Sequence, residues 1–164
     1  MSEETLRRAL FHELAAVQVG MLGIIGAGGH PRPMVHLVIP GEAALWFLAE
    51  ADGDLAAEVG TGAEARHLLT GHRHDLYASL TGPIRPVPDR QGLERVWSPA
   101  AEAIFPGGMG DLDWLPLRLT VAEAAVWRSA QSALVAGMDL ILSGLSDPAL
   151  RPREVESAVL RLGE

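Results

Sequence analysis

Between residues 19 and 87 the chain is a series of short apolar runs separated by turns, and this pattern constrains the fold most. The runs are VGMLGIIG, RPMVHLVIP, ALWFLA, EARHLLTG and LYASLTGPIRPV, with glycine- or proline-containing segments such as AGGHP and PGEA between the first three. Runs of this length between turn residues are typical of strands. Because short turns join them, they favour an antiparallel meander over parallel strands connected by helices.

The run RPMVHLVIP has side chains of different character on its two faces. In an extended chain successive side chains point to opposite faces. One predicted face carries Arg32, Met34, His36 and Val38, and the other carries Val35, Leu37 and Ile39. In the last of the five runs, Gly82 and Pro83 predict a bulge or bend.

Helical patterns flank these strands. Residues 2–17 place apolar side chains at helical spacing, and DGDLAAEVG, DRQGLERVW and SPAAEAIFPGG predict three short helices. Asp89 is the expected cap of the second of these, and Ser98-Pro99 and Gly107-Gly108 the start and stop of the third. WLPLRLTV and AAVWRS predict closing strands. SALVAGMDLIL and REVESAVLRL are helical by period and predict a helical extension over about 130–164.

Together these elements predict a mainly β protein with flanking helices (α+β). The six or seven short strands form a small antiparallel barrel. With 164 residues, we expect a single domain over 1–164.

Composition excludes several classes of function. The formal net charge is −8 and no run of Lys or Arg is present, so we expect no nucleic-acid partner. No apolar run is long enough to span a membrane, and the N-terminus does not resemble a signal peptide. With no cysteine in the chain, thiolate sites are excluded and a reducing cytoplasm is the expected location.

Catalytic motifs give little guidance. The chain has no nucleophile elbow, Walker loop or HExxH segment, and GAGGHP is best interpreted as a hairpin turn. His72 and His74 have a spacing that zinc uses, but two exposed imidazoles near a turn are commoner, and we expect no metal. Arg32 at the start of a strand suits either a phosphate or an acidic side chain, and residue type does not decide between them.

An ordered set of motifs carries a resemblance to a known family. These are RPM, LWFL, SLTG, VWSPAAEAIFPGG and LPLRLTVAEAAVW, and the resemblance extends from the N-terminal helix to about Ser129. In this order and spacing they resemble the general stress protein branch of the pyridoxamine 5′-phosphate oxidase-like family of FMN-binding split barrels. The resemblance implies a split-barrel homodimer with flavin sites at the subunit interface and activity as a small FMN-dependent oxidoreductase.

The resemblance also assigns flavin contacts. The Arg-Pro-Met segment would touch the flavin and its phosphate, the third strand would supply backbone contacts, and the remaining aromatics would approach the ring, in part from the partner subunit. The residues so assigned are Arg32, Pro33, Met34, Trp46, Phe47, Leu48, Trp97, Phe105 and Trp127. No catalytic acid or base is assigned. His36 shares the face of Arg32 and Met34, although a packed histidine is the commoner case.

The chain departs from the family where the phosphate would bind. Ala49, Gly53 and Leu55 stand where relatives carry hydroxyl and lysine side chains, and Ile104 replaces a usual tryptophan. Each charge-assisted hydrogen bond lost is worth roughly 1.5–3 kcal/mol. Two alternatives therefore remain: a ligand-binding dimer that has lost FMN and has no redox activity, and a relative that uses a deazaflavin or a tetrapyrrole.

Overall fold

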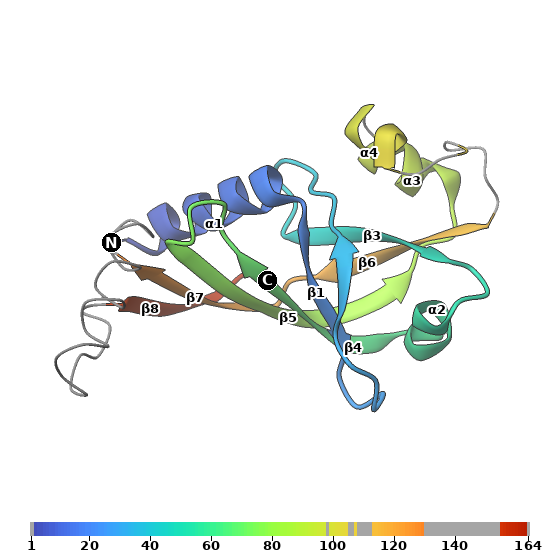
Figure 1. Cartoon of the computed structure of the whole chain (residues 1–164), viewed down its shortest axis with the longest axis horizontal. Coiled ribbons are helices and arrows are strands. Elements are labelled where there is room, and N and C mark those ends of the chain that lie inside the picture. Colours follow the sequence, from blue (N-terminus) through green and yellow to red (C-terminus); the bar gives the residue numbers. More distant parts are fainter. Residues whose placement is uncertain (1, 98, 105–106, 108–112, 130–154, 164) are drawn as a thin grey trace, which may run out of the picture.

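The computed structural model describes residues 2–97, 99–104, 107, 113–129 and 155–163 (Figure 1). Its helices are α1 (Glu3–Val17), α2 (Asp54–Val59), α3 (Arg90–Val96) and α4 (Pro99–Ile104). Its strands are β1 (Val19–Ile24), β2 (Arg32–Val35), β3 (Ala44–Glu50), β4 (Ala63–Thr70), β5 (Leu76–Pro86), β6 (Trp114–Thr120), β7 (Glu123–Ser129) and β8 (Val155–Arg161). The predicted strands between 19 and 87 and the four predicted helices before residue 108 are confirmed in this order.

The strands form one antiparallel sheet that curls into a nearly closed barrel. Along its main path the order is β2-β1-β4-β5-β6-β3, and β7 pairs with both β5 and β8. The segment after β2 meets β3 through a pair of backbone hydrogen bonds between Leu37 and Trp46. This bridge brings the two ends of the path together, so the predicted antiparallel barrel is confirmed.

β5 changes partner along its length, and Gly82 marks the change. Residues 76–81 pair with β7, whereas Ile84 to Pro86 pair with β6. The corner between β6 and β7 crosses β5 here, and a Cβ built on Gly82 would lie 1.9 Å from the Thr120 carbonyl oxygen. The Ala122 N–H donates to the Thr81 carbonyl, which fixes the corner in place. The bend predicted at Gly82 and Pro83 is therefore a crossing point that admits no side chain.

The main core fills the barrel. β4 shows the alternation clearly, because Ala65, His67 and Leu69 are buried while the residues between them are exposed. α1 packs against β5 and β8 through its apolar stripe, in which Leu10 and Leu14 are fully buried. The α1 N-terminus is capped by the Ser2 hydroxyl, which accepts from the Thr5 N–H.

The predicted helical extension is wrong over its final part. Residues 155–161 form β8, which pairs with β7 along its whole length. The apolar spacing of REVESAVLRL suits a helix or a strand alone, but the free edge of β7 offers backbone partners that only a strand satisfies. β8 is also why the sheet has eight strands and not six or seven. Residues 130–154, with the predicted helix SALVAGMDLIL, lie outside the described residues, and the single-domain boundary stays a prediction.

No helix in the described part of the chain is long and apolar enough to cross a membrane. The cytoplasmic location stays a prediction.

Candidate functional site

β3 is buried on both of its faces, which places two predicted site residues in one cluster and the third in another. Phe47 points into the barrel and is fully buried in the main core. Trp46 and Leu48 point outward into a second cluster with Leu37, Val96 and Ala101. α3 and α4 cover this outer face (Figure 1), and Asp89 caps α3 by accepting from the Gly92 N–H at 2.6 Å, as predicted.

A cavity opens beside this second cluster. It has a volume of about 280 Å³ and lies between the C-terminal end of α1, the segment 36–40 and α3. Its apolar wall includes Leu37, Ile39 and Val96, and Trp97 packs against the same cluster. Apolar and aromatic walls of this kind suit a planar aromatic ligand.

Trp46 packs in the same cluster as the residues of this cavity's apolar wall, and charged side chains contact its indole ring. Its indole N–H donates to Glu42 at 3.5 Å, and the guanidinium of Arg118 lies 5.9 Å from the ring centroid. Glu42 also forms ion pairs with Arg95 and Arg118. The indole is 3% exposed, so it forms part of the wall's support and offers little surface to a ligand.

Arg32 is engaged with an acidic side chain. Its guanidinium donates to Glu58 of α2 at 2.6 Å, and both side chains are partly buried. The three positions at which relatives carry phosphate ligands have no hydrogen-bond donor side chain in this protein. Ala49 and Leu55 are buried in the main core, and Gly53 precedes α2 without a side-chain cap. The sequence left open whether Arg32 binds a phosphate or an acidic side chain, and the structure shows the ion pair with Glu58.

Two buried histidines form a hydrogen-bonded chain inside the barrel. His36 Nε2 lies 2.7 Å from the Leu14 carbonyl, so it donates its proton there. A neutral His36 then has a free lone pair on Nδ1, which accepts from His67 Nε2–H at 2.9 Å. His67 Nδ1 is left buried without a hydrogen-bond partner among the described residues. His36 is thus the packed histidine that the sequence favoured.

Burial lowers the pKa of both imidazoles. For His67 the pKa falls to about 3 because of burial and the neighbouring His36. For His36 burial lowers the pKa and its hydrogen bond to the Leu14 carbonyl opposes that shift in part. Sequence reasoning missed this pair because His67 is far from His36 along the chain. The available signal was the alternation in β4, which puts His67 on the inward face.

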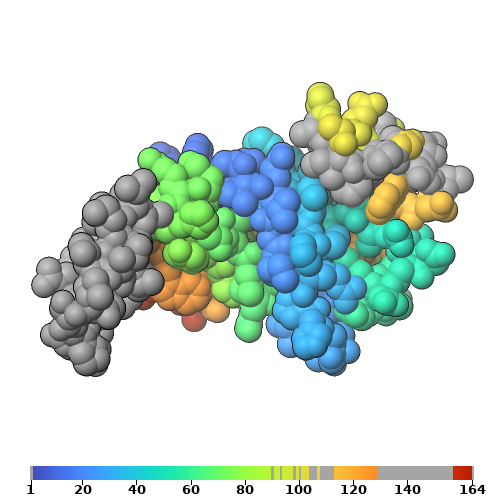
Figure 2. Space-filling model, viewed as in Figure 1, coloured from blue at the N-terminus to red at the C-terminus, as the bar shows by residue number. Residues whose placement is uncertain are grey.

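The remaining predicted residues do not gather at one place in a single chain. Met34 packs against the main core, and Pro33 is exposed on β2. Trp127 is exposed on β7. β7 lies at the opposite end of the molecule from α3 and α4, as the labels of Figure 1 and the matching colours of Figure 2 show. Phe105 and the segment that includes it lie outside the described residues. Among the described residues, the structure therefore brings Trp46, Leu48 and Trp97 together, and it places Arg32, Pro33, Met34, Phe47 and Trp127 elsewhere.

No group of three or more metal-ligating side chains occurs within the described ranges. His72, one of the two histidines with zinc-like spacing, pairs instead with Glu13, whose carboxylate lies 2.8 Å from His72 Nδ1.

Comparison with known proteins gives a consistent family. The family model described as "Pyridoxamine 5'-phosphate oxidase like" matches residues 6–148. A crystal structure described as general stress protein 26 from Jannaschia sp. CCS1 is 28% identical, with a TM-score of 0.73 over 97% of this chain and 99% of that one.

Two Xanthomonas structures are similar to the same degree. A general stress family protein from Xanthomonas campestris pv. campestris is 30% identical, with a TM-score of 0.72 and coverage of 80% and 92% of the two chains. A general stress FMN/FAD binding protein from Xanthomonas citri is also 30% identical, with a TM-score of 0.71 and coverage of 79% and 92%. Comparison with curated proteins gives no significant match.

Proposed function

The chain belongs to the pyridoxamine 5′-phosphate oxidase-like family, and from this we propose that it binds a flavin as a homodimer and acts as a small flavin-dependent oxidoreductase. The observation that carries the proposal is the cavity beside Trp97, whose apolar and aromatic walls suit an isoalloxazine ring. The Xanthomonas citri relative described as an FMN/FAD binding protein supports it. A bound flavin would supply the hydride or electron transfer.

The residues fit the flavin ring and do not fit its phosphate. Leu37, Ile39 and Trp97 offer one wall for a flat ring. A phosphate needs cations and N–H donors free to bind it. The guanidinium of Arg32 is already held by Glu58, and the nearby side chains that replace the usual ligands are apolar or absent. We therefore propose binding through the ring.

Flavin binding is tested by titrating the purified protein with riboflavin and with FMN while following flavin fluorescence. We expect both to bind, and Trp97→Ala to weaken both about equally because it removes part of the ring wall. The control is Ile25→Ala, which removes an exposed apolar side chain from the turn after β1, outside the cavity. A protein that binds neither flavin would contradict the proposal. That result would favour the alternative of a flavin-free ligand-binding dimer. The Arg32–Glu58 ion pair is consistent with this alternative, because it occupies the guanidinium that would bind the phosphate.

Glu58→Gln is expected to strengthen FMN binding about tenfold and to leave riboflavin binding unchanged. Removing the carboxylate frees the guanidinium of Arg32, and one charge-assisted hydrogen bond to a phosphate is worth roughly 1.5–3 kcal/mol. The measurement is the ratio of the two dissociation constants. Glu64→Gln is the matched control, because it removes an equal charge from an exposed position on β4. Adding Arg32→Ala to Glu58→Gln should abolish the gain, and a gain that persists would place the phosphate elsewhere.

An exposed apolar band supports the homodimer. On the outer face of the sheet Met21 lies opposite Leu68, and Tyr77 lies opposite Trp127. These residues and Val159 are all exposed, from 38% for Met21 to 59% for Val159. An apolar band that crosses neighbouring strands is typical of a protein interface. In a symmetric dimer the same band meets its own copy.

Leu68→Glu is expected to convert the dimer to a monomer, because it places a charge in the middle of the apolar band. Light scattering during size-exclusion chromatography measures the mass. Ala57→Glu, which adds the same side chain on the exposed face of α2, should leave the dimer intact. A native chain that is already a monomer at micromolar concentration would contradict the dimer.

A further inference from the structure

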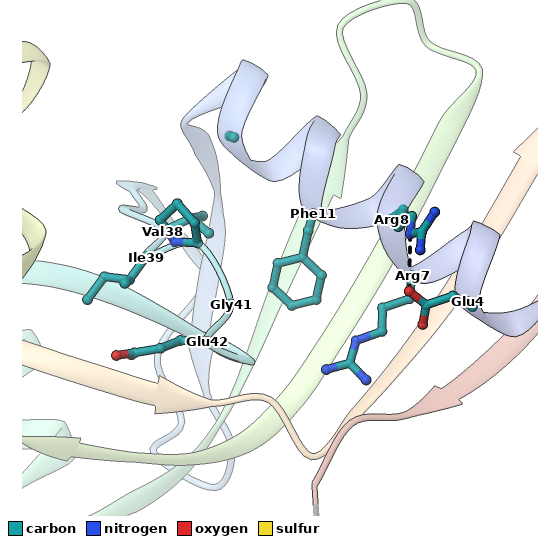
Figure 3. Close-up of a pocket in the computed structure, with 10 residues that line it drawn as sticks. Glu4, Arg7, Arg8, Phe11, Val38, Ile39, Gly41 and Glu42 are labelled. Atoms are coloured by element: carbon teal, nitrogen blue, oxygen red, sulfur yellow. Dashed lines mark hydrogen bonds and ion pairs between the residues drawn. The ribbon is translucent and has the colours of Figure 1, made fainter.

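A second cavity adjoins the first and has a different character. Its volume is about 350 Å³, and it lies between α1 and the segment 38–42 (Figure 3). Val38 and Ile39 line one side and Phe11 of α1 lines the other. Ala15 and residues 38–40 line both cavities. The volume is within the range of about 300–1,000 Å³ that small-molecule sites occupy.

Every charged side chain that lines this cavity has an ion-pair partner among the described residues, except Arg7. Arg8 pairs with Glu4 at 3.1 Å, and Glu42 forms ion pairs with Arg95 and Arg118. Arg7 forms no ion pair or side-chain hydrogen bond with any other residue in the described part of the chain. One exposed guanidinium is therefore free at the edge of an apolar cavity.

Helix geometry places that guanidinium beside the apolar lining. Arg7 and Phe11 are four residues apart in α1, so their side chains share a face of the helix. Figure 3 shows both projecting from α1 to the same side, toward the strand layer, and a dashed line marks the hydrogen bond that Arg8 makes with Glu4. A guanidinium binds carboxylates through two parallel hydrogen bonds, and Phe11, Val38 and Ile39 provide contact for an apolar body.

We propose that this cavity binds an amphipathic anion, with its carboxylate or sulfonate on Arg7 and its apolar body against Phe11, Val38 and Ile39. The site selects for one negative charge attached to an apolar ring or chain. It disfavours a cation of the same shape, because Arg7 would repel it. The proposal is independent of flavin binding, since none of its contacts involves a flavin. The shared residues 38–40 would bring the apolar end of such a ligand next to the cavity beside Trp97.

The first test is a fluorescence titration of the flavin-free protein with 8-anilinonaphthalene-1-sulfonate, an apolar sulfonate whose emission rises in an apolar site. Arg7→Gln should weaken its binding about tenfold, since one charge-assisted hydrogen bond is lost. Arg73→Gln is the matched control, because it removes an equal charge from an exposed side chain outside the cavity that Asp75 already pairs with. It should change the dissociation constant less than twofold. Equal losses in the two variants would overturn the proposal.

The second test uses the native chain and separates the charge from the apolar body. Decanoate should displace the probe at lower concentration than decanol, and decylammonium should compete least. Equal competition by decanoate and decylammonium would show nonspecific apolar binding and overturn the proposal. Ala15→Phe, at an exposed helix position that lines the cavity, should reduce probe binding by filling it. Unchanged binding in that variant would place the probe elsewhere. Far-UV circular dichroism confirms that each variant is folded.

Discussion

Gly82→Ala is expected to lower the free energy of unfolding by roughly 3 kcal/mol or more, because the added methyl group has no space at the crossing of β5. Its Cβ would lie 1.9 Å from the Thr120 carbonyl oxygen and 2.9 Å from the Ala122 nitrogen. Both are backbone atoms, so no side-chain rotation relieves the clash. The corner between β6 and β7 would have to move away, and the hydrogen bond from Ala122 to Thr81 would be lost with it.

The measurement is urea or thermal unfolding, and a loss of this size corresponds to roughly 10 °C in Tm for a chain of this length. Gly62→Ala is the control. A Cβ at Gly62 would meet only the Ile84 carbonyl oxygen, at 3.8 Å, which is ordinary contact. If both substitutions cost the same, the crossing point is not where β5 is constrained.

Acid is expected to destabilise the protein well above the pH at which carboxylates titrate, because two histidines are buried in the neutral form. Burial lowers the pKa of His67 to about 3, and it also lowers the pKa of His36, whereas both ordinary values are 6.5. As the pH falls below 6.5 the unfolded chain binds protons that the folded chain excludes. The free energy of unfolding is therefore at its full value above this pH and falls below it, by up to about 1.4 kcal/mol per pH unit for each histidine.

The measurement is urea unfolding at a series of pH values between about 7 and 5, where His67 alone should cost roughly 2 kcal/mol and His36 should add to this loss. Replacing both, in His36→Leu/His67→Leu, should flatten this dependence, since removing both partners leaves no buried polar group unpaired. His30→Gln removes an exposed imidazole and should leave the slope unchanged. A slope that survives in the double variant would assign the proton uptake to other groups.

Local pattern was enough to predict most of the fold. The alternation in residues 32–39 predicted which side chains share a face. The structure confirms the two sets, because Met34 and Val38 pack against the main core while Val35, Leu37 and Ile39 pack in the second cluster. Asp89 and the bend at Gly82 were also readable from the sequence, because a cap and a bend depend on neighbouring residues. β8 could not be predicted from the sequence, because helical and strand periods fit REVESAVLRL equally. Pairing with the open edge of β7 is what makes this segment a strand.

The candidate site was less predictable because its interactions join distant segments. Arg32 was singled out as a ligand for either a phosphate or an acidic side chain, but its partner Glu58 lies in a helix whose position depends on the whole barrel. Likewise, His67 is unremarkable until β1 and β4 bring it beside His36. The sequence did not indicate that Arg7 lacks an ion-pair partner within the described ranges. This follows only once the structure shows that Glu4 pairs with Arg8 and Glu42 pairs with Arg95.

The bridge between Leu37 and Trp46 has a consequence for the order in which the chain folds. The hairpins β1–β2 and β4–β5 join segments close in sequence, so their contacts form at small loop-closure cost. β3 meets the segment after β2 locally, but its other neighbour, β6, comes from far along the chain. We therefore expect the barrel to close only once β6 has been synthesised and has paired with both β5 and β3.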